Sequence, residues 1–320
     1  MSPKSTKYST NLLSLLLFQS ATTQSVPSEI IGCNDLSCPL DGSYDCHLAD
    51  RTYSNVGLAR IPDPPSPLEG LTLLKGVHVS GGTANNTAED DEVSYHSAFY
   101  LGFPESLSVD DFSGCAVMFN EFTGEFDGND KRSAVGSCPD VIEEACIGAL
   151  TSRAQEIFDG TRSGDICGIL GRELQQQNTT LTECRHFAGQ DAGLGNFTVA
   201  SLSDLLPIAG AQNASSDCWP VLPKSDGLVF SGEDVRVNTF TGDASLSELF
   251  KITPVLTVFP SNGDGDSSAQ LTCLKAVEVI ESDEDEDGNE EAGDDAGALF
   301  SVNMVSLMLG ALVSIGFAMV

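Results

Sequence analysis

Residues 252–279 of this 320-residue chain read ITPVLTVFPSNGDGDSSAQLTCLKAVEV. Two runs rich in Val, Leu and Thr, at 252–259 and 269–279, flank a segment of Gly, Asn, Asp and Ser. Short runs of apolar and β-branched residues favour strands, and glycine beside asparagine favours a tight turn. The stretch therefore predicts two antiparallel strands joined as a hairpin.

Runs of the same kind occur elsewhere in the chain, each bounded by Gly, Pro, Asn or Ser. They lie at 71–79, 95–103, 115–122, 228–230 and 235–240. We expect each run to form a short antiparallel strand. Because such strands must bury an apolar face against a second layer, they predict a sandwich.

The segment between these two groups of strands has a helical periodicity. Pro139 suits a first helical turn, and the apolar residues after it recur on one helix face as far as Gly160. A second, shorter helix is predicted at 165–176. The predicted fold class is α+β, mainly β: an antiparallel β-sandwich-like head with a helical, disulfide-rich insertion at about 137–185. Two smaller domains divided near Asp130 are the alternative.

Both ends of the chain carry features of secretion and surface attachment. Lys4 and Lys7 precede a short apolar stretch at 12–18, which predicts a signal peptide at 1–24. At the other end, 298–320 is apolar and uncharged, which is typical of a removable glycosylphosphatidylinositol (GPI) attachment signal. A buried core helix is the alternative at each end. The attachment candidates are Gly293, Asp294, Asp295 and Gly297.

The composition is strongly acidic, with 15 Lys and Arg against 47 Asp and Glu and a net charge of −32. Phosphate backbones repel such a chain, so nucleic acid is excluded as a partner. Acidic residues are densest at 281–297. We expect this segment to be a disordered stalk between the head, at 25–280, and the apolar tail.

Four aspartates within the stalk have the spacing of a calcium-binding EF-hand loop. They are Asp283, Asp285, Asp287 and Asp294. The last stands where such loops carry a bidentate Glu, and no amphipathic helix flanks the segment. We therefore favour an acidic spacer that binds cations loosely, and we predict no specific metal site and no cofactor.

The chain has ten cysteines, an even number that predicts disulfides formed in an oxidising compartment. They are Cys33, Cys38, Cys46, Cys115, Cys138, Cys146, Cys167, Cys184, Cys218 and Cys273. Spacing does not fix their connectivity, although a bond between Cys146 and Cys167 would join the two predicted helices. His78 and His96 fall in two predicted strands and can face one another, but the four histidines lack the spacing of a zinc site.

Four Asn-X-Ser/Thr sequons predict N-glycosylation of exposed loops. Their acceptor residues are Asn85, Asn178, Asn196 and Asn213. Together with the terminal segments and the cysteines, they favour an extracellular compartment. They also predict a heavily hydrated middle part of the head.

These features together resemble the fungal GPI-anchored, cysteine-rich cell-surface glycoproteins. The segment 137–174 is also similar to the cysteine-bearing helical segments of uncharacterised secreted fungal proteins, on the residues Cys138-Pro139-Asp140, Glu144-Ala145-Cys146 and Asp165-Ile166-Cys167. The resemblance implies a location on the extracellular face of the plasma membrane or in the cell wall. It carries over no catalytic residue.

The sequence contains no nucleophile elbow, zinc-protease helix, phosphate loop or dinucleotide-binding turn. Our first prediction is a non-enzymatic GPI-anchored surface or wall glycoprotein with a structural or binding role. Its expected partners are the membrane, through the anchor, and wall polysaccharide or other surface proteins. Trp219, which lies beside Cys218, is predicted to be a core residue packed on a disulfide rather than a sugar-stacking platform.

Two alternative functions belong to other classes. One is an anchored hydrolase that acts on wall polysaccharide through a pair of carboxylates. The carboxylate candidates that border predicted strands are Asp110, Asp111, Glu121 and Glu125. The other alternative is a cation-binding coat protein.

Overall fold

The computed structural model describes residues 46–48, 51–81, 92–104, 106–108, 110, 113–128, 130–161, 164–176, 181–203, 205, 228–239, 242–261 and 266–277. These residues form two four-stranded antiparallel sheets with a few helices, so the predicted class, α+β and mainly β, is confirmed. The predicted signal peptide, acidic stalk and apolar tail lie outside the described residues. No helix in the ranges above is long and apolar enough to cross a membrane.

The first sheet has the strand order β3-β4-β5-β8. Its strands are β3 (Asn55–Arg60), β4 (Thr72–Gly81), β5 (Glu92–Gly102) and β8 (Leu228–Thr239). The strands predicted at 71–79 and 95–103 are confirmed, and the runs at 228–230 and 235–240 belong to one continuous strand. Between Phe99 and Tyr100 the register against β8 shifts, because Phe99 pairs with Gly232 and Tyr100 with Phe230. Ser231 is the extra residue of this bulge.

The second sheet has the order β10-β9-β6-β7. Its strands are β6 (Cys115–Phe119), β7 (Phe197–Ser201), β9 (Thr253–Phe259) and β10 (Ser268–Leu274). The predicted hairpin is confirmed, since β9 pairs with β10 along the whole of both strands. Every residue of β6 and β9 is buried. Burial on both faces explains why these strands are continuous apolar runs rather than alternating ones.

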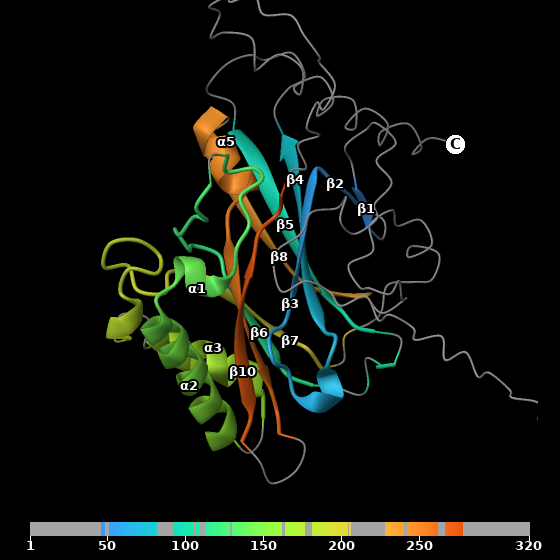
Figure 1. Ribbon diagram of the computed structural model, residues 1–320, viewed down its shortest axis with the longest axis vertical. Helices are drawn as coiled ribbons and strands as arrows, with labels where there is room; N and C mark the ends of the chain where they lie inside the picture. Colours follow the sequence, from blue (N-terminus) through green and yellow to red (C-terminus); the bar gives the residue numbers. More distant parts are fainter. Residues whose placement is uncertain are drawn as a thin grey trace, which may run out of the picture.

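The second sheet lies between the first sheet and a layer of helices (Figure 1). Two residues on opposite faces of β6 show this layer order. Cys115 is bonded to Cys167 in the helical layer, whereas Met118, on the opposite face, packs against Gly232 of the first sheet. Apolar residues from both sheets and from the helices form one continuous buried core.

The helical layer consists of α1 (Cys138–Val141), α2 (Glu144–Gly160) and α3 (Ile166–Gln176). The single helix predicted from Pro139 to Gly160 is therefore divided in two. Asp140 accepts hydrogen bonds from the backbone N–H and the hydroxyl of Ser137, at 2.7 and 2.8 Å, and so fixes the first turn. Ile142 then adopts an extended conformation, with φ −127° and ψ 128°, which ends α1 before α2 begins.

Three disulfides hold this layer in place among the described residues. They are Cys115–Cys167, Cys138–Cys273 and Cys146–Cys184. The first two join α3 and α1 to strands β6 and β10. Cys146 and Cys167 do not bond to each other, because α2 and α3 both lie on the sheet and their cysteines meet different neighbours. Of the remaining four cysteines, Cys33, Cys38 and Cys218 lie outside the described residues, and Cys46 begins strand β1.

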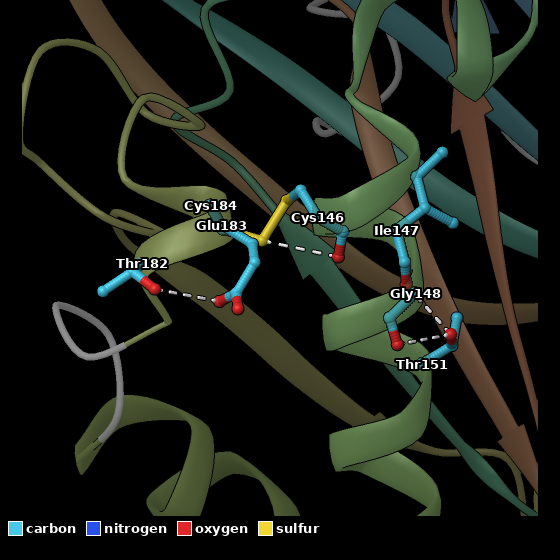
Figure 2. Close-up of a disulfide and its surroundings, with 7 residues drawn as sticks. All are labelled: Cys146, Ile147, Gly148, Thr151, Thr182, Glu183 and Cys184. Carbon is cyan, nitrogen blue, oxygen red and sulfur yellow. Dashed lines mark hydrogen bonds between the residues drawn. A yellow bond between two sulfur atoms is a disulfide. The ribbon is translucent and has the colours of Figure 1, made fainter.

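The third disulfide ties α2 to the short 3-10 helix η3 (Thr182–Cys184), as Figure 2 shows. The Cα atoms of Cys146 and Cys184 are 4.9 Å apart, and Cys184 is buried against the helix. One turn further along α2, the Thr151 hydroxyl donates to the carbonyls of Ile147 and Gly148 at 2.9 and 3.2 Å. The Cys146–Cys184 disulfide therefore holds the chain segment that follows α3 against the helical layer.

Three smaller elements, none of them predicted, complete the head. The strands β1 (Cys46–Leu48) and β2 (Arg51–Tyr53) form a hairpin beside the first sheet. The Tyr53 ring packs directly on Gly76 of β4, where a Cβ atom would lie 2.7 Å from the ring. The helix α5 (Gly242–Leu249) lies near the top of the view in Figure 1, and β9 follows it in the chain.

A cavity at one end of the sandwich

A cavity of about 460 Å³ opens between α5, the residues that lead from α5 into β9, and the loop that follows β6. Its polar lining includes three carboxylates and three ammonium groups, and its apolar lining includes three phenyl rings. These residues are Glu121, Glu125, Glu248, Lys131, Lys251, Lys275, Phe122, Phe126 and Phe250. The size and mixed lining fit a binding site for a small polar ligand.

Two of the four candidate catalytic acids line this cavity, and both have cationic partners. Glu125 accepts a hydrogen bond from the Lys131 ammonium at 2.7 Å. Glu121 accepts hydrogen bonds from the backbone N–H and side-chain amide of Asn196, at 3.0 and 2.6 Å, and lies 3.4 Å from Arg236. The backbone N–H of Asn196 is the main cause that lowers the pKa of Glu121.

The other two candidate acids lie elsewhere. Asp110 is exposed and does not line the cavity, and Asp111 is outside the described residues. Asp110 donates its backbone N–H to the hydroxyl of Ser108 at 3.5 Å, in a surface turn. The sequence therefore identified two residues of the cavity, through their position just after a strand.

Glu248 and Lys251 have no ion-pair partner in the part of the chain that the structure describes. Glu248 lies in the last turn of α5, and Lys251 precedes β9, so both are positioned by regular structure. They place one carboxylate and one ammonium group at the cavity without an ion-pair partner among the described residues. These are the groups in the lining that a ligand can engage at the least energetic cost.

Lys275 forms part of the inner wall. It is 3% exposed, and its ammonium donates to the carbonyls of Ala134 and Arg132 at 2.9 and 3.4 Å. The Phe250 ring lies 5.5 Å from Nζ, within range of a cation–π contact. Burial lowers the pKa of Lys275 to about 8. The side chain holds the loop at Ala134 against the end of β10, and so fixes one side of the cavity.

A second buried lysine contacts the backbone of Lys251, a residue of the cavity lining. Lys75 of β4 is 1% exposed and crosses between the sheets, where its ammonium donates to the Lys251 carbonyl at 2.8 Å and the Thr253 hydroxyl at 3.0 Å. Burial lowers its pKa to about 7. The sequence analysis did not single out this residue. Its signal was a lysine within a run of buried residues on β4, two residues after Leu73 and on the same face.

His78 and His96 face one another on β4 and β5, as predicted. Their rings are stacked, with centroids 4.5 Å apart and planes at 12°. His96 shares hydrogen bonds with the Ser80 hydroxyl, at 2.7 Å, and with the Glu233 carboxylate, at 3.3 Å. Burial lowers the pKa of His78. Stacked rings do not converge on a common ligand position, and the described residues contain no group of three or more His, Cys, Asp or Glu side chains arranged to bind a metal.

Of the four sequon asparagines, Asn196 alone belongs to the described ranges, and it is exposed. The other acceptors, Asn85, Asn178 and Asn213, lie outside these ranges. So do Trp219, the aspartates of the EF-hand-like segment, and the four GPI attachment candidates.

The chain was compared with known proteins on sequence and on structure. It matches no family model, no curated protein and no solved structure. The functional argument for this chain therefore depends on its own residues and on the geometry of the cavity.

Proposed function

We propose that this chain is a GPI-anchored cell-surface or cell-wall glycoprotein whose disulfide-bonded head binds a saccharide unit of a surface polysaccharide. The observation that carries the binding role is the cavity, whose lining includes Glu248 and Lys251, two groups of opposite sign that have no ion-pair partner in the described part of the chain. A sugar hydroxyl both donates and accepts hydrogen bonds, so it can satisfy a carboxylate and an ammonium group together. The three phenyl rings are at most 7% exposed, so they form the apolar wall of the cavity and the charged groups supply its contacts with hydroxyls.

The extracellular location is supported by two independent features. Three disulfides stabilise the head, and such bonds persist in oxidising compartments. The terminal segments have the order of a signal peptide and a GPI attachment signal. A wall or surface polysaccharide is a hydroxyl-rich ligand within reach of an anchored head.

The hydrolase is the second candidate, because Glu121 and Glu125 line the same cavity. A glycosidase needs one carboxyl group whose pKa is raised, so that it can protonate the leaving group. The pKa of Glu121 is lowered instead, and Glu125 is paired with Lys131. Binding without hydrolysis is therefore the better-supported function.

The cation-binding coat protein depends on Asp283, Asp285, Asp287 and Asp294, which lie outside the described residues.

Treatment of intact cells with phosphatidylinositol-specific phospholipase tests the anchor. We expect the protein to move from the cell fraction into the medium, because the enzyme cleaves the lipid from a GPI anchor. Immunoblotting of both fractions measures the release. A GPI-anchored protein of the same cells serves as a positive control. Retention of this chain while the control is released would contradict the anchor.

A further inference from the structure

The sequon asparagine Asn196 is hydrogen-bonded to a residue that lines the cavity. Its side-chain Nδ2, the atom that carries an N-linked glycan, is 2.6 Å from Oε1 of Glu121, a residue of the cavity lining. Its backbone N–H donates to the other oxygen of the same carboxylate, at 3.0 Å. The preceding residue, Gly195, lies so close to Ala188 and Glu121 that a Cβ atom there would be 2.7 and 2.8 Å from their side chains. The chain at 195–196 therefore rests on two residues that line the cavity.

The hydrogen bonds to Glu121 leave Asn196 open to glycosylation. The Glu121 carboxylate receives the backbone N–H and one N–H of the side-chain amide, and that amide carries two hydrogens. One hydrogen therefore remains for substitution, and Asn196 is exposed. Transfer of an oligosaccharide from a diphosphate-linked lipid donor forms the bond from sugar C1 to Nδ2. The diphosphate leaves with its bonding electron pair, and the second amide proton is lost. The amide N–H that remains can still donate to Glu121.

We infer that a glycan on Asn196 forms one wall of the cavity mouth and restricts what enters the cavity. Glu121 fixes the amide, and the amide fixes the direction of the first sugar, which extends beside the lining rather than at a distance from it. The acceptor's neighbours support a defined orientation. Phe197 begins β7, and the Thr198 hydroxyl of the same sequon accepts a hydrogen bond from the Asn120 amide at 2.9 Å. This inference rests on the proposed function only in requiring a secreted, glycosylated chain.

The test uses full-length protein purified from detergent extracts of the cells, and it needs no knowledge of the ligand. Acetylation with an N-hydroxysuccinimide ester of acetic acid, followed by peptide mass spectrometry, measures how fast Lys131 and Lys251 react in the cavity. The comparison is between wild-type protein, Thr198→Ala, which removes the sequon but keeps Asn196, and Thr198→Ser, which keeps the sequon and the hydroxyl. Peptide mapping establishes the glycan occupancy of each protein.

We expect both lysines to react several-fold faster in Thr198→Ala, and at the wild-type rate in Thr198→Ser. Trimming the native wild-type glycan to its first sugar with an endoglycosidase should give an intermediate rate, and it tests the idea without any substitution. Equal rates in trimmed and untrimmed protein would overturn the inference, as would an unmodified Asn196 in a chain glycosylated elsewhere. The two claims can fail separately. If the glycan changes the lysine reactivity but the protein binds no saccharide, the proposed binding role is refuted and this inference stands.

Discussion

Replacement of both Cys138 and Cys273 by alanine will lower the free energy of unfolding by roughly 5 kcal/mol, which threatens folding of the head altogether. The bond joins residues 135 positions apart, and it ties α1 to β10, the outer strand of the second sheet. Without the bond the unfolded chain gains the entropy of a long open loop, and α1 loses its attachment to the sheet. Urea unfolding followed by tryptophan fluorescence and far-ultraviolet circular dichroism measures the loss.

The matched comparison is removal of Cys146 and Cys184, whose separation is 38 residues. The same loop-entropy relation gives roughly 4 kcal/mol for this bond. We therefore expect the Cys138/Cys273 pair to be the more costly one to remove. If the variant with alanine at positions 138 and 273 unfolds at the same urea concentration as the wild type, this disulfide does not form.

The second large effect concerns the buried ammonium of Lys75. Its pKa is about 7 in the folded chain, against an ordinary value of 10.5. Between these pH values the unfolded chain binds a proton that the folded chain does not bind. The free energy of unfolding therefore rises as the pH increases across this window, by an amount on the order of 4 kcal/mol, and this contribution is lost as the pH falls to 7.

Lys75→Met removes the titrating group and keeps most of the side-chain volume. We expect the rise in unfolding free energy between pH 7 and pH 10 to be smaller in this variant than in the wild type, by several kcal/mol. Leu73→Met, at the neighbouring inward position of β4, introduces the same side chain without removing a charge, and it should keep the wild-type slope. Urea unfolding at both pH values measures the slopes. Parallel slopes for Lys75→Met and the wild type would show that the Lys75 ammonium is not desolvated.

The strands that the sequence predicted are those with long apolar runs and strong turn residues. The hairpin of β9 and β10 is the clearest example, because both strands are buried and a glycine-rich segment separates them. β7 was missed since it is an edge strand of five residues, four of them only partly buried. β3 was missed because Gly57 interrupts its apolar pattern. The structure requires glycine there: a Cβ atom would lie 1.8 Å from the Lys275 carbonyl oxygen.

The helix α5 and the disulfide pairing show a different limit. The segment GDASLSEL has only two leucines to suggest a helix face, so its helical state depends on packing against β8. Disulfide pairing depends on which elements become neighbours in the folded head. Cys146 and Cys167 lie on adjacent helices, yet each reaches a partner outside that pair.

The cavity combines four segments that are distant in the sequence: the loop after β6, the region around Ala188, α5 with the residues that lead into β9, and Lys275. A search along the sequence finds residue types, and it found Glu121 and Glu125 because they follow a strand. It could not find Glu248 and Lys251, whose significance comes from the lack of an ion-pair partner among the described residues. It also could not link Asn196 to Glu121, which are 75 residues apart.

Calorimetric titration of the purified full-length protein with soluble oligomers of glucose, mannose and N-acetylglucosamine tests the binding role most directly. The variants are Glu248→Gln and Lys251→Met, with Glu69→Gln, an exposed acid outside the cavity, as the control. The account predicts saturable binding of one oligomer class, weakened about tenfold or more by Lys251→Met, weakened also by Glu248→Gln, and unchanged by Glu69→Gln. Absence of binding to all three oligomers, or binding that neither cavity variant weakens, would contradict it.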